Sequence, residues 1–101
     1  MKEQQLQTKI IKYLESIDCY TVKVVSATKR GVPDIIFMHN GRFCAIEIKA
    51  PGKLQNVTEI QQWNLDRINF LGGTAIAVDA LATVKDVFHY PYPPTAEYID
   101  A

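Results

Sequence analysis

The chain has 101 residues, of which 48% are hydrophobic and 22% are charged, and its formal net charge is zero. These values are typical of one small globular domain and exclude an intrinsically disordered chain. No apolar stretch approaches the ~20 residues that cross a bilayer, and the polar start of the chain does not resemble a signal peptide. We therefore expect a cytoplasmic protein. Cys19 and Cys44 lack a CxxC spacing, so both are expected to be small core thiols.

The charges are distributed unevenly along the chain. Residues 1–53 contain nine Lys or Arg and five Asp or Glu, for a net charge of +4, whereas residues 54–101 contain two and six, for a net charge of −4. A metal ion bound by acids of the first half would leave that half more basic still, which suits contact with nucleic acid. A chance asymmetry is the alternative interpretation.

Hydrophobic periodicity predicts a helix and three strands in the first half of the chain. Residues 3–17 have the apolar spacing of an amphipathic helix, and the β-branched residues that follow predict a strand over 20–25. Two segments that are apolar on both faces, 34–39 and 42–49, predict strands in the middle of a sheet covered on both sides. Glu3 extends the inward stripe of the first helix, so it is either part of a solvated helix start or directed toward the domain's interior edge.

The second half of the chain predicts a helix, a strand and a short helix. Asn56 and Glu59 have the spacing of a capping box for a helix that runs to Leu71, and the two glycines after it end this helix. A buried strand over 74–78 and a short helix ending at residue 88 follow. The tail that begins at residue 90 contains three Pro and three Tyr and is not expected to form a regular element.

The helix that begins near Asn56 presents two different faces. Gln61 falls within its inward stripe, where the amide is either satisfied by backbone groups or directed into a site. Trp63 and Phe70 fall on the opposite side, seven residues apart. Large aromatic side chains there predict a partner surface, although packing beneath the C-terminal tail is the alternative.

The segment from Gly31 to Lys49 carries the candidate chemistry. The Asn-Gly pair at its centre predicts a two-residue hairpin turn, and the register of this turn places Asp34 opposite Glu47. Two facing carboxylates repel each other unless a positive charge lies between them. Lys49 lies two residues beyond Glu47 and therefore on the same face of the sheet. Two acids and a lysine at one end of an apolar hairpin indicate a site for a hard cation beside a phosphate.

The order of these parts resembles the PD-(D/E)xK nuclease superfamily and, within it, the VRR-NUC family. The resemblance covers about residues 3–88. Four segments carry it: the helix pattern E-x-x-[IL]-Q-x-x-I-x-x-Y-L from Glu3 to Leu14, G-x-P-D from Gly31 to Asp34, AIEIKAPGKL from Ala45 to Leu54, and Gln61 eleven residues before Gly72.

The resemblance implies an α/β fold with a restriction-endonuclease-like αβββαβα core, in which helices flank a mixed central sheet. Residues 1–90 would form a VRR-NUC-like nuclease domain, and residues 91–101 would be a Pro/Tyr tail and a candidate dimer contact. It further implies a phosphodiester hydrolase that depends on Mg²⁺ or Mn²⁺. In its site Asp34, Glu47 and the backbone carbonyl of Ile48 would bind the metal, and Glu3 would complete the acidic cluster, directly or through water.

Two other side chains have implied roles in catalysis. Lys49 would orient the attacking water or stabilise the developing charge, and Gln61 would hold Lys49 or the water in position. The basic residues expected to contact DNA phosphates are Lys29 and Arg30, which precede Asp34, and Lys53, which follows Lys49. For the first pair, a merely solvated surface loop is the alternative.

Stand-alone members of this family resemble structure-specific endonucleases that act as homodimers, some of them on four-way junctions. We therefore expect a Holliday-junction-resolvase-like homodimer of phage or bacterial origin that acts on branched DNA, in a role such as DNA repair. Trp63 and Phe70 are the candidate interface residues. Two alternatives stay open. One is a nicking or restriction-type nuclease on ordinary duplex DNA, and the other is a non-catalytic DNA-binding module.

Overall fold

A computed structural model describes residues 1–89, and the tail predicted as a candidate dimer contact lies outside the described residues. The predicted order of helices and strands is confirmed, with one additional 3₁₀ turn. The first strand is shorter than predicted, because its partner strand begins at Ile35, opposite Lys23. In chain order the elements are α1 (Glu3–Ser16), β1 (Tyr20–Lys23), β2 (Ile35–His39), β3 (Arg42–Ile48), η1 (Leu54–Asn56), α2 (Glu59–Phe70), β4 (Thr74–Val78) and α3 (Leu81–Val87).

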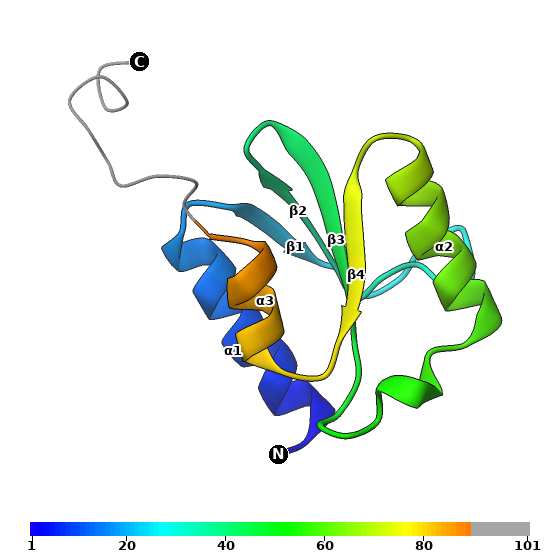
Figure 1. Cartoon of the computed structure of the whole chain (residues 1–101), viewed down its shortest axis with the longest axis horizontal. Coiled ribbons are helices and arrows are strands. Elements are labelled where there is room, and N and C mark those ends of the chain that lie inside the picture. The colour runs from blue at the N-terminus through cyan, green and yellow to red at the C-terminus, as the bar shows by residue number, and fades with distance from the viewer. Residues whose placement is uncertain (90–101) are drawn as a thin grey trace.

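The four strands form one mixed sheet in the order β1-β2-β3-β4. The two pairs among the first three strands are antiparallel, whereas β3 and β4 are parallel and are joined through α2. Figure 1 shows α1 and α3 together on one face of the sheet and α2 on the other face. This is the predicted α/β architecture, a mixed sheet flanked by helices.

The main core lies between the sheet and the α1–α3 pair. It consists of apolar side chains that alternate along the strands and recur every three or four residues along α1, as both periodicities require. A smaller cluster on the other face contains Ala45, Leu65 and Ala75, where α2 covers β3 and β4. The buried members of the main core include Leu6, Ile10, Leu14, Ile35, Phe37, Cys44, Ile46, Ile48, Val78, Val84 and Phe88.

The second face of the sheet is covered only in part, which corrects the prediction that β2 and β3 are covered on both sides. Tyr20 is 75% exposed, Met38 43% and Phe43 46%, and all three lie on the face that carries α2. The reason is tertiary: α2 packs against β3 and β4 and covers the row of Ala45 and Ile36, but it leaves the neighbouring row of Phe43, Met38 and Tyr20 exposed. Periodicity alone does not reveal where a covering helix stops.

The β2–β3 hairpin has the predicted turn. Asn40 and Gly41 have φ angles of 54° and 72°, the left-handed values that a type I′ turn requires at both central positions. His39 pairs with Arg42, Phe37 with Cys44 and Ile35 with Ile46. The register predicted from the Asn-Gly pair is therefore confirmed.

The start of α2 differs from the prediction. Thr58 is the N-cap, and the capping box is closed by Gln61, three residues further along the chain, instead of Asn56 and Glu59. Asn56 belongs to the preceding 3₁₀ turn. Asn64 and Leu65 are the buried residues of the helix. Two residues of the predicted inward stripe, Ile60 and Leu71, are 45% and 67% exposed.

Both cysteines are free and buried, as predicted. Burial, with smaller contributions from Cys44 and Asp18, raises the pKa of the Cys19 thiol from 9.0 to about 11. Both thiols therefore fit the expected structural role. Within residues 1–89, no helix is long and apolar enough to span a membrane.

A matched pair of glycine substitutions tests how closely α2 holds the loop before β2. A Cβ at Gly31, whose φ is +73°, would lie 2.9 Å from Ile60 Cγ1 and 3.0 Å from its backbone, whereas a Cβ at Gly41, with φ of +72°, would meet nothing within 4 Å. Both alanines carry the cost of a left-handed conformation, about 1 kcal/mol. Gly31→Ala adds overpacking of roughly 1–3 kcal/mol. Urea unfolding should show this additional loss, and equal losses for the two variants would contradict the close contact.

Candidate active site

Asp34 and Glu47 face each other at the end of the β2–β3 hairpin. Ile35 pairs with Ile46, so the next position of the register brings Asp34 opposite Glu47. Two hydrogen bonds fix Asp34: the Val24 N–H donates to its backbone oxygen at 2.8 Å, and the Ile48 N–H donates to its Oδ2, also at 2.8 Å. The carboxyl group of Asp34 is thus held against the β3 backbone beside Glu47.

Glu47 is a buried acid in an electrostatically unfavourable position. Only 3% of the residue is exposed. Burial, followed by the charge of Asp34 and a hydrogen bond to it, raises the pKa of Glu47 from 4.5 to about 8. Lys49 opposes this shift, because its Nζ lies 3.6 Å from Glu47 Oε2. One lysine only partly offsets the cost of holding two carboxylates together.

The donor set of this site fits a hard divalent cation. Carboxylate and backbone carbonyl oxygens are the ligands that Mg²⁺ and Mn²⁺ prefer, and a cation between Asp34 and Glu47 would stabilise the ionised form of both. The predicted ligands Asp34 and Glu47 are adjacent, and the backbone N–H of Ile48 donates to Asp34 Oδ2. Within residues 1–89, no three His, Cys, Asp or Glu side chains are grouped so as to hold a metal ion. The side-chain ligands of a bound cation would therefore come from this pair.

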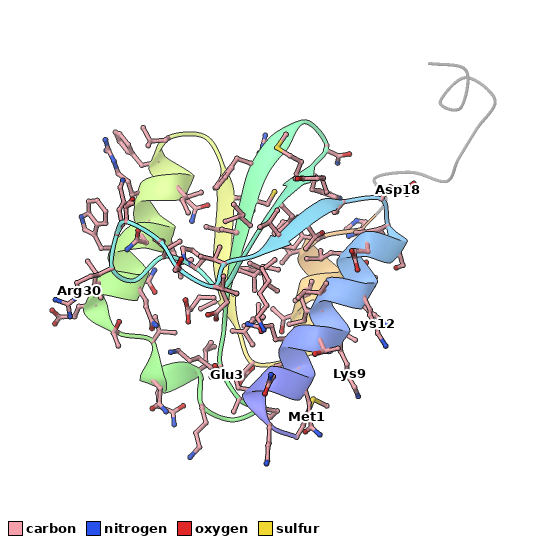
Figure 2. The ribbon with its side chains drawn as sticks, turned by 180° about the vertical axis from the view of Figure 1, so that it is seen from behind. Met1, Glu3, Lys9, Lys12, Asp18 and Arg30 are labelled. Atoms are coloured by element: carbon pink, nitrogen blue, oxygen red, sulfur yellow. The ribbon has the colours of Figure 1, made fainter. Side chains whose placement is uncertain are left out.

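Glu3 is exposed in the first turn of α1. Figure 2 shows its side chain at the start of α1, on the flank that faces the rest of the domain. Figure 1 places the start of this helix beside the segment of chain that follows β3. Glu3 is therefore exposed to solvent, as one alternative predicted. Its flank of α1 also faces the end of the sheet that carries Asp34 and Glu47, as the other alternative predicted. A direct carboxylate cluster of all three is not formed, and a ligand role through water stays a prediction.

Gln61 has the backbone role that was one of its two predicted alternatives. Its Oε1 accepts from the Thr58 N–H at 3.0 Å, and its own N–H donates to Thr58 Oγ1 at 3.3 Å. The side chain is half-buried. Since its oxygen serves the helix start, any contact with Lys49 or with a water would use its Nε2 group.

The loop that carries Lys29 and Arg30 is tied to α2. The buried Asn64 donates from Nδ2 to the Arg30 carbonyl at 3.0 Å and to the Ile60 carbonyl at 2.8 Å. Both basic side chains are exposed, and Figure 2 shows Arg30 at the outer edge of the molecule beside α2. The sequence placed Asn64 in the inward stripe without a role, although a polar residue in such a stripe signals a specific partner.

Asp79, like Asn64, holds a loop near the site and was not recognised in the sequence. Asp79, which directly follows β4, accepts at Oδ2 from the Gly52 N–H at 3.1 Å. Because β3 and β4 are parallel and Ile48 pairs with Val78, this bond ties the loop after Lys49 to the end of the neighbouring strand. Lys53, an exposed residue of the same loop, is held by a bond from its N–H to the Ala50 carbonyl at 2.9 Å.

Trp63 and Phe70 are 54% and 79% exposed, so both point away from the core as predicted. They line a shallow surface hollow of about 210 Å³ together with Asp66 and Arg67. The Arg67 guanidinium lies 5.4 Å from the centre of the Phe70 ring, a cation–π contact on the surface. Whether this hollow contacts a second subunit stays a prediction.

Solved structures of other proteins share this fold. One, described as a "VRR_NUC domain protein", has a TM-score of 0.70 and 20% sequence identity over 86% of this chain and 84% of its own. Another, described as a "VRR_NUC domain", has a TM-score of 0.70 and 20% identity over 91% of this chain and 99% of its own. No protein-family model and no curated protein matches the chain. The chain therefore has the fold of VRR_NUC domains, which confirms the fold that the sequence motifs predict.

Because the pKa of Glu47 is raised in the folded state, we expect the free energy of unfolding, measured in a chelating buffer, to depend on pH. Below pH 4.5 both the folded and the unfolded state hold the proton; between pH 4.5 and about 8 only the folded state does. The free energy of unfolding should therefore fall as pH rises through this window, by about 1.4 kcal/mol per pH unit. Urea titrations from pH 5 to 8 measure the slope.

Two variants identify the group responsible for that slope. Glu47→Gln cannot ionise, so it should remove the slope and be more stable than the wild type at pH 9. Glu15→Gln, at an exposed position of α1, is the matched control and should keep the slope. The same slope in the wild type and in Glu47→Gln would show that Glu47 titrates normally.

Proposed function

We propose that the chain is a metal-dependent, structure-specific DNA endonuclease that hydrolyses phosphodiester bonds. One observation carries this proposal: Asp34 and Glu47 face each other across the β2–β3 hairpin with Lys49 at 3.6 Å from Glu47, on a fold shared with VRR_NUC domains. Facing carboxylates of which one is fully buried cost stability. A protein that only binds DNA has no need to retain this cost.

The chain's own residues would divide the chemistry among them. Asp34 and Glu47, with the Ile48 carbonyl, would hold Mg²⁺ or Mn²⁺. When bound, such an ion neutralises phosphate charge and favours deprotonation of water at neutral pH. Asp34 is held in place by the Ile48 N–H, so this ligand is oriented before substrate arrives, which lowers the cost of assembling the site.

Lys49 is the candidate for charge stabilisation. Its ammonium pairs with Glu47 and its side chain is only 14% exposed, so a phosphate oxygen at the site would meet a donor that is already partly desolvated. Hydrolysis joins the water oxygen to phosphorus and breaks the bond to the leaving sugar oxygen, which takes up a proton. A donor beside the phosphate stabilises the charge that develops on its oxygens.

Delivery of DNA to this site would depend on the basic loops at its rim. Lys29 and Arg30 are carried by a loop that Asn64 fixes to α2, and Lys53 by a loop that Asp79 fixes to β4. These tethers favour phosphate contacts in a defined position over freely moving lysines. A domain of this size offers little surface for gripping DNA, so a two-fold dimer with two sites suits a branched substrate such as a four-way junction.

The interface of that dimer has two candidate surfaces. One is the hollow between Trp63 and Phe70. The other is the bare part of the sheet formed by Tyr20, Met38 and Phe43, where exposed apolar area would be removed from water on association.

Substitutions at the site separate catalysis from binding. Asp34→Asn and Lys49→Ala should each lower the rate of DNA cleavage with Mn²⁺ by about 100-fold or more, because each removes a group that acts on the scissile phosphate, while DNA affinity is retained. Glu15→Gln, at an exposed position of α1, is the control and should cleave normally. Undiminished cleavage by either site variant would remove that residue from the mechanism.

A substrate panel separates the proposal from a duplex nuclease. We expect faster cleavage of a four-way junction than of a flap or a linear duplex of the same length, with Mn²⁺ present. Sedimentation at micromolar concentration should give the mass of a dimer. Equal rates on the three substrates would favour a nicking or restriction-type enzyme, and full activity in a monomeric species would exclude the dimer.

A further inference from the structure

The outward surface of α1 has an excess of positive charge that the active site does not use. Lys9 and Lys12 line a surface hollow of about 500 Å³ together with Met1, Gln5 and Thr8. Positions three residues apart are neighbours on a helix, so the two ammonium groups repel each other. Among residues 1–89 the ion pair is between Lys49 and Glu47 and involves neither Lys9 nor Lys12. Neither lysine of the hollow is neutralised by a carboxylate.

A third lysine, from α3, extends this surface. The Nζ of Lys85 lies 5.5 Å from the centre of the Tyr13 ring on α1. Tyr13 in turn donates from its hydroxyl to the Phe88 carbonyl at 2.7 Å, so α3 is fixed beside this flank of α1. We call the surface formed by Lys9, Lys12 and Lys85 the lysine face. Glu15 and Asp86 are the nearby acids in the sequence, and they leave an excess of positive charge.

The lysine face and the active site lie on different flanks of α1. Figure 2 shows Glu3 on the flank that faces the rest of the domain, and Lys9 and Lys12 on the opposite flank, pointing away from it. From Glu3 to Lys12 the helix rises about 13 Å. A straight duplex that covers Asp34 and Glu47 would pass Glu3 and would not reach around the helix to both lysines.

We propose that the lysine face binds the phosphate backbone of a second duplex arm of branched DNA. This inference rests on the proposed nuclease function, which brings DNA to the adjacent flank of the same helix. Lys9 and Lys12 are neighbours on the helix surface, so both ammonium groups can contact phosphates of one DNA strand. Gln5 adds a donor to this surface. Its Oε1 accepts from the Lys2 N–H at 2.8 Å, which leaves its Nε2 group able to donate to a phosphate.

Such a surface would select substrates by shape. Contacts from lysines to phosphates carry no base information, so the lysine face would add affinity for any molecule that presents a second arm at the correct angle. A linear duplex would occupy the active site alone. The preference for branched DNA would then come from the distance between two binding surfaces within one domain.

Charge reversal tests this assignment through binding without cleavage. Affinity for a four-way junction and for a linear duplex of the same length is measured by fluorescence anisotropy in EDTA, over a range of salt concentrations. Lys9→Glu/Lys12→Glu should weaken junction binding about tenfold or more and lower its salt dependence by about two ion equivalents, with a change of less than about threefold for the duplex. Lys9→Gln/Lys12→Gln should show the same pattern to a smaller extent, which guards against misfolding of the reversed variant.

Two further measurements distinguish junction binding by the lysine face from a general effect of charge: a charge-reversal control elsewhere on the surface and binding to lipid vesicles. Lys23→Glu/Arg42→Glu changes charge equally at exposed positions outside the lysine face and should leave the ratio of junction to duplex affinity unchanged. An equal loss for both DNAs, an equal loss in the control, or a wild type that binds no junction at 100-fold excess would each overturn the inference. So would lysine-dependent binding to phosphatidylserine vesicles without an effect on the junction.

The two proposals fail separately. If the wild type cleaves no DNA with Mn²⁺ but the lysines govern junction binding, the nuclease proposal fails and the lysine face stands. If Lys9→Glu/Lys12→Glu binds and cleaves junctions like the wild type, only the lysine face is rejected.

Discussion

The structure depends on the two-residue turn at Asn40 and Gly41, because this turn fixes which residues of β2 and β3 face each other. Its left-handed φ angles match the twist of an antiparallel pair and leave one register. That register brings Asp34 opposite Glu47 at the far end of the hairpin. A slip by one residue would turn every side chain of one strand to the other face, which would expose Ile46 and Ile48 and separate the acids.

The acids are held together against their repulsion by the rest of the fold. Burial of Glu47 and its nearness to Asp34 raise the pKa of Glu47. The ionised pair therefore destabilises the folded state, and the apolar core around it must offset this loss. Ile35, Ile46 and Ile48 are fully buried between the sheet and α1, and removing them from water stabilises the hairpin. The site is therefore a local instability supported by its surroundings, an arrangement that is frequent where a charged ligand binds.

The helices position the loops around this pair. Asn64 on α2 holds the loop of Arg30, and Asp79 at the end of β4 holds the loop of Lys53. Helix α1 brings Glu3 to one flank and Lys9 and Lys12 to the other. The sheet and its loops thus arrange the acidic pair and the basic residues around it, and α1 carries the lysine face on its outward flank.

The sequence by itself determined the order of the elements, the hairpin register and the pairing of Asp34 with Glu47, because these follow from local turn geometry and from alternation along strands. Tertiary structure decided what depends on neighbours far along the chain. Gln61 has a capping role because α2 begins at Glu59, and Tyr20, Met38 and Phe43 are exposed because α2 does not cover the cross-strand row that they form. Asn64 and Asp79 became recognisable as anchors only through partners 34 and 27 residues away, which periodicity does not encode.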